Sequence, residues 1–298
     1  MNFRQLKYFV ATAETGQVSR AANALSISQS AITTAIRELE SELATGLFTR
    51  TAHGMEMTQA GRELLALSYE ILTKIDEAVN IRERASGTSG RIIMATTYTV
   101  IGYFLPYHLD RLARLHPNLE IQIHELNRES VEEGLLANRF DIALVLTSNI
   151  SNPGIETETL LRSPRRLWLP QGHRLADRAR VRFDEIAAED YIMLTVDEAA
   201  NTTMKYWNSN AMQPNVRLRT SSIEAVRSMV ANGRGVTVLS DMVYRPWSLE
   251  GKRIVTVETD PGVPSMDIGL AWRRGADITP ATLVLHAYFR QAFHTPQI

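Results

Sequence analysis

The first sixty residues constrain the fold of this chain most, because apolar residues at helical spacing alternate there with sharp turns over a short span. The spacing predicts a helix over residues 3–13, which Gly16 ends. It also predicts a shorter helix over residues 19–25 and a third over residues 28–43. Ser28 stands where a hydroxyl can cap the first turn of that third helix. This order is typical of a helix-turn-helix module.

The third predicted helix has one apolar and one polar face. Ile32, Ile36 and Leu39 fall within a narrow arc of the helix, and polar side chains lie opposite them. Hydroxyl, amide and guanidinium groups on such a face can contact base edges in a DNA major groove. The alternative interpretation is a solvated polar face, which most amphipathic helices have. The helix residues expected to contact DNA are Ser28, Gln29, Ser30, Thr33, Thr34 and Arg37.

Two short extended segments follow this helix and favour the DNA-binding interpretation. Residues 47–50 and 57–61 flank a turn that contains Gly54, which predicts a small wing beside the helix. We expect Arg50 and His53 of this wing to contact phosphates or the minor groove.

The order and spacing of these residues resemble the winged helix-turn-helix of LysR-type transcriptional regulators. The matching residues are Leu6, Phe9, Gly16, Ala21, Ala22, Leu25, Ser28, Gln29, Leu39, Glu40, Leu43, Leu47 to Arg50 and Thr58 to Gly61. The resemblance implies a sequence-specific regulator that binds double-stranded promoter DNA at an operator. It also implies a small-molecule effector that binds a second domain.

The predicted module carries no excess of positive charge, which bears on how it holds DNA. Its basic residues are Arg4, Lys7, Arg20, Arg37 and Arg50, and its acidic residues are Glu14, Glu38, Glu40, Glu42 and Glu56. A module that bound DNA alone through a broad basic surface would show clustered lysine and arginine. Linked modules gain affinity without new contacts, so the charge balance favours an oligomer.

A long helix predicted over residues 59–84 offers a means of oligomerising. Its apolar stripe consists of Leu64, Leu65, Leu67, Ile71, Leu72, Ile75, Ala78 and Val79. The stripe either packs on its own domain or pairs with the same helix of a second copy. The resemblance favours pairing and implies a homodimer, with a homotetramer as the larger assembly. The segment 84–90, rich in serine and glycine, then predicts a hinge.

The remainder of the chain alternates predicted strands and helices, which indicates an α/β domain. Predicted strands span residues 91–96, 119–126, 141–146, 155–160, 165–169, 191–195, 216–219, 236–239 and 267–272, and predicted helices span 102–115, 130–138, 183–187, 203–211, 222–231 and 280–293. We expect two α/β lobes with a ligand cleft between them. The resemblance implies the same architecture, similar to that of periplasmic binding proteins.

The expected fold is therefore an α-helical, winged helix-turn-helix module followed by a long linker helix and a two-lobed α/β effector domain. The predicted boundaries are 1–58 for the DNA-binding module, 59–90 for the linker and hinge, and 91–298 for the effector domain. Lobe I would comprise residues 91–161 and 267–298, and lobe II residues 162–266.

Hydroxyl and amide side chains recur where predicted strands of both lobes end. The residues expected to bind the effector are Thr96, Thr97, Tyr98, Thr99, Thr147, Thr195, Asn201, Thr202 and Ser221. Serine and threonine ahead of helices are also ordinary caps, so capping is the alternative for each. Because no lysine or arginine lies within these runs, we expect hydroxyls and backbone amides to bind a small anion or carboxylate.

Several classes of protein and of site are excluded or disfavoured. The chain has no cysteine, which excludes disulfides, thiolate metal sites and the thiol-based peroxide sensing of some LysR-type regulators. Its seven histidines lack metal-ligand spacing, and it has neither a nucleophile elbow nor a P-loop. We therefore expect no enzyme activity, metal or cofactor. Since no leader or membrane-length apolar run is evident, we expect a cytoplasmic protein without membrane contact.

Two other classes stay open at this point. One is a solute-binding or sensor protein of the same two-lobed fold that does not bind DNA. The other is a small-molecule enzyme built on these lobes, for which no residue pattern in the sequence speaks.

Overall fold

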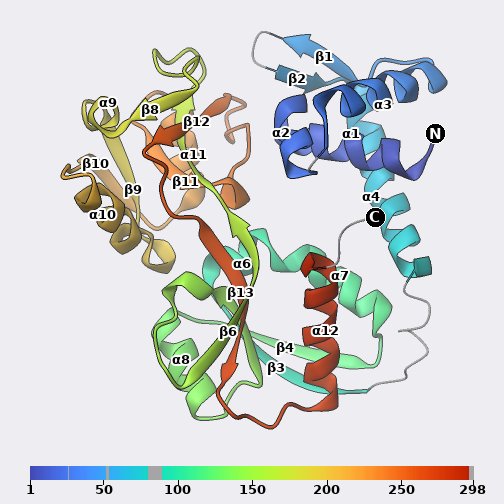
Figure 1. Ribbon diagram of the computed structural model, residues 1–298, viewed down its shortest axis with the longest axis vertical. Helices are drawn as coiled ribbons and strands as arrows, with labels where there is room; N and C mark the ends of the chain where they lie inside the picture. Colours follow the sequence, from blue (N-terminus) through green and yellow to red (C-terminus); the bar gives the residue numbers. More distant parts are fainter. Residues whose placement is uncertain (26, 52–53, 80–88, 295–298) are drawn as a thin grey trace. The chain divides into compact units, whose positions relative to one another are not determined.

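The structure is a computed structural model that describes residues 1–25, 27–51, 54–79 and 89–294. It divides into two units, Met1–Ser86 and Gly87–Ile298. Figure 1 shows a mostly helical N-terminal unit and a second unit in which helices cover β-sheets. Each unit has an apolar core of its own.

The N-terminal unit is a winged helix-turn-helix, as predicted. Its elements are α1 (Phe3–Thr15), α2 (Val18–Ala24), α3 (Gln29–Glu42), β1 (Phe48–Thr51), β2 (Gly54–Met57) and α4 (Gln59–Val79). Asn2 and Gln5 form a capping box at the start of α1. Gly16 ends α1 in the left-handed conformation, with φ 66°, and its N–H bonds to the Thr12 carbonyl. Strands β1 and β2 pair antiparallel and form the wing.

The apolar residues of the three short helices meet in two adjoining clusters. Leu6, Phe9 and Leu39 pack with Leu47 and with Leu64 of α4. The second cluster comprises Ala21, Ala22, Ile32 and Ile36. Because α3 contributes to both clusters, its apolar face is fixed inward and its polar face is turned to solvent.

A tight junction at Leu47 ties α3, the wing and α4 together. The Glu40 carboxylate accepts the backbone N–H of Leu47 at 2.7 Å and that of Phe48 at 3.2 Å. The Thr58 hydroxyl donates to the Gly46 carbonyl at 2.7 Å and accepts the N–H of Gly61 at 3.0 Å. A Cβ atom on Gly61 would lie 2.2 Å from the Leu47 carbonyl oxygen. The first turn of α4 therefore lies so close to this carbonyl that only glycine fits at position 61.

Lobe I of the second unit contains a five-stranded sheet in the order β4-β3-β5-β13-β6. The strands are β3 (Gly90–Thr96), β4 (Leu119–Glu125), β5 (Ile142–Leu146), β6 (Ile155–Ser163) and β13 (Met266–Arg273). Its helices are α6 (Tyr98–Tyr103), α7 (Leu105–Leu115), α8 (Arg128–Leu136) and α12 (Pro280–His294). Strands β3, β4 and β5 are parallel, so their carboxyl ends meet at one edge of the sheet.

Alternation along each strand divides the lobe I core into two layers. Met94 and Leu144 face α7 and α12, which contribute Leu112 and Phe289 to one cluster. Ala95, Ala143 and Val145 face α8 in the other cluster. The period of two along the strands thus builds a sheet that is covered on both faces.

Lobe II contains the strand order β11-β7-β12-β8 and a parallel pair, β9 and β10. The strands are β7 (Arg165–Pro170), β8 (Arg180–Arg182), β9 (Asp190–Leu194), β10 (Asn215–Thr220), β11 (Thr237–Ser240) and β12 (Ile254–Asp260). Its helices are α9 (Phe183–Ala187), α10 (Ala199–Ser209) and α11 (Ile223–Ala231). A bridge between Tyr191 and Val236 connects β9 to the residue before β11.

The chain passes between the lobes twice, from β6 to β7 and from β12 to β13. The Arg165 guanidinium of the first passage donates to the carbonyls of Pro264 and Ser265 in the second. The Ser163 hydroxyl, at the first passage, accepts hydrogen bonds from Ser240 at 2.7 Å and from the Met242 amide at 3.0 Å. The Arg165 contacts join the two passages, and the Ser163 contacts attach the first passage to the end of β11.

The predicted pattern of strands and helices is confirmed for most elements, with three differences. The helix predicted over residues 102–115 is two helices, α6 and α7. They separate because Pro106 has no N–H to donate to the preceding turn. Strands β8 and β12 were not predicted, although the β-branched residues of Ile254–Asp260 favour a strand. The linker helix is described to Val79, and its predicted continuation to residue 84 lies outside the described residues.

We expect Gly61→Ala to destabilise the N-terminal unit by about 2 kcal/mol, because the new methyl group would overlap the Leu47 carbonyl oxygen. Chemical denaturation of the full chain, followed by circular dichroism, measures the change. Gly46→Ala is the matched control, since a Cβ atom there meets no atom within 4 Å. Equal stability of the two variants would contradict the close approach.

We expect His108 to make the second unit less stable in acid. Its imidazole is 7% exposed and lies 2.9 Å from the Tyr288 hydroxyl, and burial lowers its pKa from 6.5 to about 4. Between these two pH values His108 is protonated in the unfolded chain and neutral in the folded chain. The free energy of unfolding therefore falls as the pH drops from 6.5 towards 4. Because glutamine does not titrate, His108→Gln should reduce the pH 7 to pH 4 loss by about 3 kcal/mol, measured by urea unfolding. An unchanged loss would contradict this assignment.

Candidate functional site

The polar face of α3 is accessible along its length. Ser28 caps the helix, as predicted, and accepts the Ala31 N–H at 3.2 Å. The exposed residues among those predicted to contact DNA are Ser28, Gln29, Ser30, Thr34 and Arg37. Thr33 is half-buried and donates its proton to the Gln29 carbonyl at 2.9 Å, which leaves its oxygen as an acceptor.

Arg50 lies on the wing beside this helix. It is exposed on β1, where it pairs with Met55 of β2. His53, the other predicted wing contact, lies outside the described residues. An exposed guanidinium at this place can reach a phosphate oxygen.

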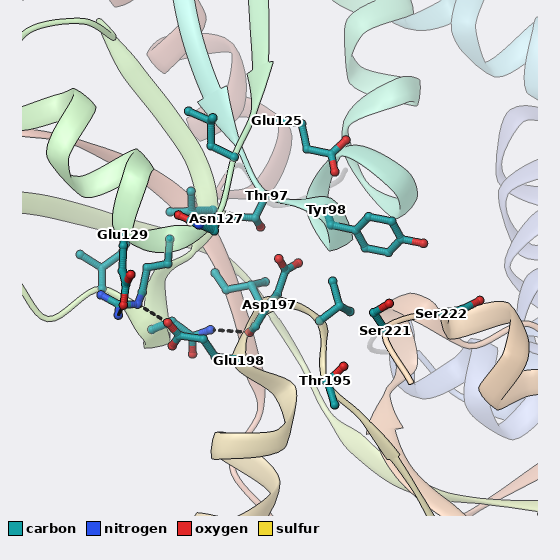
Figure 2. A pocket seen from close by; sticks show the side chains of 17 residues that line it. Thr97, Tyr98, Glu125, Asn127, Glu129, Thr195, Asp197, Glu198, Ser221 and Ser222 are labelled. Atoms are coloured by element: carbon teal, nitrogen blue, oxygen red, sulfur yellow. Dashed lines mark hydrogen bonds and ion pairs between the residues drawn. The ribbon is translucent and has the colours of Figure 1, made fainter. Parts of the chain in front are cut away.

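A cavity of about 740 Å³ lies between the two lobes of the second unit (Figure 2). Its lining residues are Thr97, Tyr98, Glu125, Leu126, Asn127, Arg128, Glu129, Val145, Leu146, Asn149, Ile150, Thr195, Val196, Asp197, Glu198, Ser221 and Ser222. The volume suits a small organic molecule. Four of the predicted effector residues, Thr97, Tyr98, Thr195 and Ser221, are brought together here.

The other predicted effector residues lie elsewhere. Thr99 and Thr202 line a separate void of about 30 Å³, close to the space of one water molecule. Thr96 donates to the Leu144 carbonyl at 2.8 Å, and the Thr147 hydroxyl lies 2.9 Å from that of Thr159. The Thr96 hydroxyl connects the neighbouring strands β3 and β5, and the Thr147 hydroxyl connects the turn after β5 to β6. Asn201 is exposed on α10 and is among the lining residues of neither space.

The capping alternative can be decided for two of these side chains, and for the serine next to a third. Thr97 stands at the N-cap of α6 and Thr195 at the N-cap of a short helical turn, but neither side chain makes a capping hydrogen bond. Ser222, next to Ser221, does cap α11 and accepts the Ala225 N–H at 3.1 Å. The hydroxyls of Thr97 and Thr195 are therefore not used as caps.

Sequence reasoning missed the charged residues of the cavity. Glu125, Arg128 and Glu129 follow or end β4, while Asp197 and Glu198 follow β9. Thr97 was predicted because it is a polar residue that follows a predicted strand. The residues after β4 meet the same criterion. The omission arose because only hydroxyl and amide side chains were considered as ligand contacts.

The segment Val196–Glu198, here called the interlobe strap, reaches from lobe II to lobe I across the cavity. The Thr99 N–H donates to Asp197 Oδ2 at 2.6 Å, and Asn149 Nδ2 donates to the Asp197 carbonyl at 3.1 Å. The Arg128 guanidinium pairs with the Glu198 carboxylate. Figure 2 shows the strap residues between the side chains of the two lobes.

The strap has an unusual backbone. Asp197 has φ 49° and Glu198 has φ 62°, in the left-handed region that residues other than glycine rarely adopt. Such a conformation costs about 1–3 kcal/mol per residue and persists only where the surroundings hold it. The interlobe contacts of Asp197 and Glu198 supply that restraint.

Arg128 is surrounded by carboxylates. Its Nη1 lies 2.9 Å from Glu132, its Nη2 lies 3.5 Å from Glu129, and its Nε bonds to Glu198. The hydrogen bonds to Glu198 and then to Glu132 hold the pKa of Arg128 above its ordinary value. Its positive charge is therefore compensated within the protein.

Thr97 has a hydroxyl with no internal partner. The residue is 4% exposed, and its Oγ1 makes no hydrogen bond to any described residue. A buried hydroxyl without a partner costs free energy, so an orphan at a cavity wall indicates a contact with something that enters the cavity. In Figure 2 the Thr97 hydroxyl and the Asp197 carboxylate point into the same space.

Two kinds of feature are absent from the described ranges. No helix there is long and apolar enough to cross a bilayer. The same residues contain no group of three or more histidine, aspartate or glutamate side chains arranged to hold a metal ion.

Two protein-family models match the chain, one for each unit. Residues 3–62 match the bacterial regulatory helix-turn-helix protein of the lysR family, and residues 85–294 match the LysR substrate binding domain. The hydrogen peroxide-inducible genes activator of Dickeya chrysanthemi is 31% identical over 281 residues, which cover 89% of this chain and 91% of that protein.

Solved structures agree with these matches. HinK, a LysR family transcriptional regulator from Pseudomonas aeruginosa, superposes with a TM-score of 0.64 at 29% identity, covering 98% of each chain. Full-length CbnR in complex with its target DNA has the same fold, with a TM-score of 0.54 at 22% identity over 98% of this chain and 99% of that one. With a helix-turn-helix and an effector-binding domain that both match regulator models, this chain belongs to the LysR family of DNA-binding transcriptional regulators.

Proposed function

We propose that a small molecule bound in the interlobe cavity controls how this regulator binds promoter DNA. The observation that carries the proposal is a cavity lined by both lobes and crossed by the strap, so that a ligand in it contacts both lobes at once. A ligand changes an equilibrium only by binding one arrangement better than another. A molecule that spans the two lobes meets this condition, because its contacts depend on the distance between them.

The DNA-reading residues we propose are the exposed polar residues of α3 and Arg50 of the wing. Hydroxyl, amide and guanidinium groups on one helix face suit the edges of bases in double-stranded operator DNA. His53 stays a prediction, as does the division of the chain into 1–58, 59–90 and 91–298. A regulator of bacterial promoters acts in the cytoplasm, where that DNA lies.

The assembly we propose is a homodimer that can form a homotetramer. Part of the α4 stripe, including Leu64, packs within its own unit, but Leu67 is 54% exposed. An exposed leucine on a long helix is suited to pairing with a second copy. The near-neutral charge of the reading module supports the same assembly, because single modules of this kind hold DNA weakly.

The effector differs in chemistry from that of a thiol-based peroxide sensor. Although one relative is named for induction by hydrogen peroxide, this chain has no cysteine to oxidise. The small anion or carboxylate expected from the sequence gains support from the Thr97 hydroxyl. Four carboxylates in the lining oppose it, so the effector we propose is defined here only as a small molecule.

We expect the double variant Gln29→Ala, Arg37→Ala to lose sequence discrimination. Each residue is exposed on α3, and loss of a bidentate base contact reduces preference for the correct base by about tenfold or more. The measurement is the ratio of affinities for the promoter region and for a scrambled duplex, in gel shifts at fixed salt concentration.

Arg4→Ala is the control, because Arg4 is exposed on α1 and its removal deletes one positive charge without touching α3. This control should weaken binding to both duplexes alike and preserve their ratio. A promoter preference that survives in the double variant would show that α3 is not the reading helix.

A further inference from the structure

We propose that the interlobe cavity takes a ligand with a positively charged nitrogen, an organic ammonium, which binds between Asp197, Glu125 and the ring of Tyr98. This inference rests on the proposed function and names the chemical class of the effector. It replaces the anion that strand-end hydroxyls alone would favour.

The charges of the lining point to a cation. The cavity wall contains the carboxylates of Glu125, Glu129, Asp197 and Glu198, and Arg128 is the one basic residue among the described residues that line it. Arg128 directs its Nε and both Nη nitrogens at carboxylates of the protein itself. It therefore has little capacity left for a ligand carboxylate, for which a free guanidinium fork is the usual partner.

Asp197 is held in position to meet such a ligand. The Thr99 N–H binds one carboxylate oxygen at 2.6 Å, and Asn149 fixes the backbone carbonyl of the same residue. The second oxygen, Oδ1, accepts no hydrogen bond from the described residues. A carboxylate fixed in this way binds a cation without first losing side-chain freedom.

The neighbours of Asp197 add groups that suit an ammonium. Tyr98 lines the cavity and is 40% exposed, so one face of its ring is available for a cation–π contact. Glu125 is exposed, and its carboxylate makes no hydrogen bond or ion pair to the described residues. The orphan hydroxyl of Thr97 can accept an N–H bond. This buried, unpartnered group is independent of the acidic residues and indicates that a ligand reaches the same place.

The proposed ligand would bind both lobes. Thr97, Tyr98 and Glu125 belong to lobe I, whereas Asp197 belongs to the strap of lobe II. An ammonium between them would offset the mutual repulsion of the two carboxylates and would add to the contacts that hold the strap on lobe I. The cation would therefore favour the arrangement in which the lobes are closed.

Thermal denaturation of the full-length protein tests this inference with probes of matched length. We expect 1,4-diaminobutane and agmatine, at millimolar concentration and constant ionic strength, to raise the Tm in a concentration-dependent manner. Succinate and 1,4-butanediol should leave the Tm unchanged. Because the diamine, the diol and the dicarboxylate share a four-carbon length, differences between their effects on the Tm report charge and not length.

Asp197→Asn is the decisive variant, because its side-chain oxygen can still accept the Thr99 N–H while its charge is lost. We expect it to weaken the apparent affinity for the amines by about tenfold or more. Asp177→Asn, which removes an exposed carboxylate outside the cavity lining, should retain the wild-type response. Glu125→Gln should weaken the amine response without a loss of stability in the absence of ligand.

Three results would overturn the inference: no rise in Tm with either amine, a rise with succinate instead, or equal amine responses of Asp197→Asn and Asp177→Asn. Gel shifts with and without 1,4-diaminobutane separate this inference from the proposed function. An amine response that depends on Asp197 but leaves promoter binding unaltered would support the ammonium site and contradict effector control of DNA binding. A succinate response that alters promoter binding would contradict the ammonium site and support effector control of DNA binding.

Discussion

The bond between the Thr99 amide and the Asp197 carboxylate is the interaction on which the functional part of the second unit depends. It connects residues that are 98 positions apart and belong to different lobes. With the Asn149 and Arg128 contacts it holds the strap in a backbone conformation that the strap would not adopt alone. The placement of the Asp197 and Glu198 carboxylates in the cavity wall follows from this attachment.

Much of the fold could be predicted from the sequence because periodicity and caps act locally. Gly16, Ser28 and the alternation of β3 and β5 have their effects within a few residues, and each lies where expected. The cavity was predicted less completely, because its charged residues come from two segments far apart in the sequence, 125–129 and 197–198. Adjacent residues in the sequence also differ in what they contact. The pleat of β3 turns the Thr96 hydroxyl towards Leu144, whereas Thr97 stands at the start of the next helix and faces the cavity.

The residues that carry the family resemblance have different physical roles in the DNA-binding unit. Gln29 and Arg50 are exposed and available to DNA. Glu40 and Gly61, in contrast, bind or approach the backbone at Leu47 and fix the wing relative to α3. The motif therefore combines residues that can contact DNA with residues that fix the position of the wing relative to α3. The contacts in the structure distinguish these two roles.

The strained strap also affects how much binding energy a ligand would need to change the arrangement of the lobes. The two left-handed residues cost about 1–3 kcal/mol each and so oppose what the three interlobe contacts of the strap contribute. Converting a population from 1:99 to 99:1 requires about 5.5 kcal/mol of preferential binding. A ligand that binds one arrangement alone stabilises it by RT ln(1 + [L]/Kd), which is about 2.7 kcal/mol when the ligand concentration is 100 times Kd. In the proposed control by a cavity ligand, the two unfavourable conformations would weaken the hold of the strap on lobe I, so that less preferential binding energy would be needed to change the arrangement of the lobes.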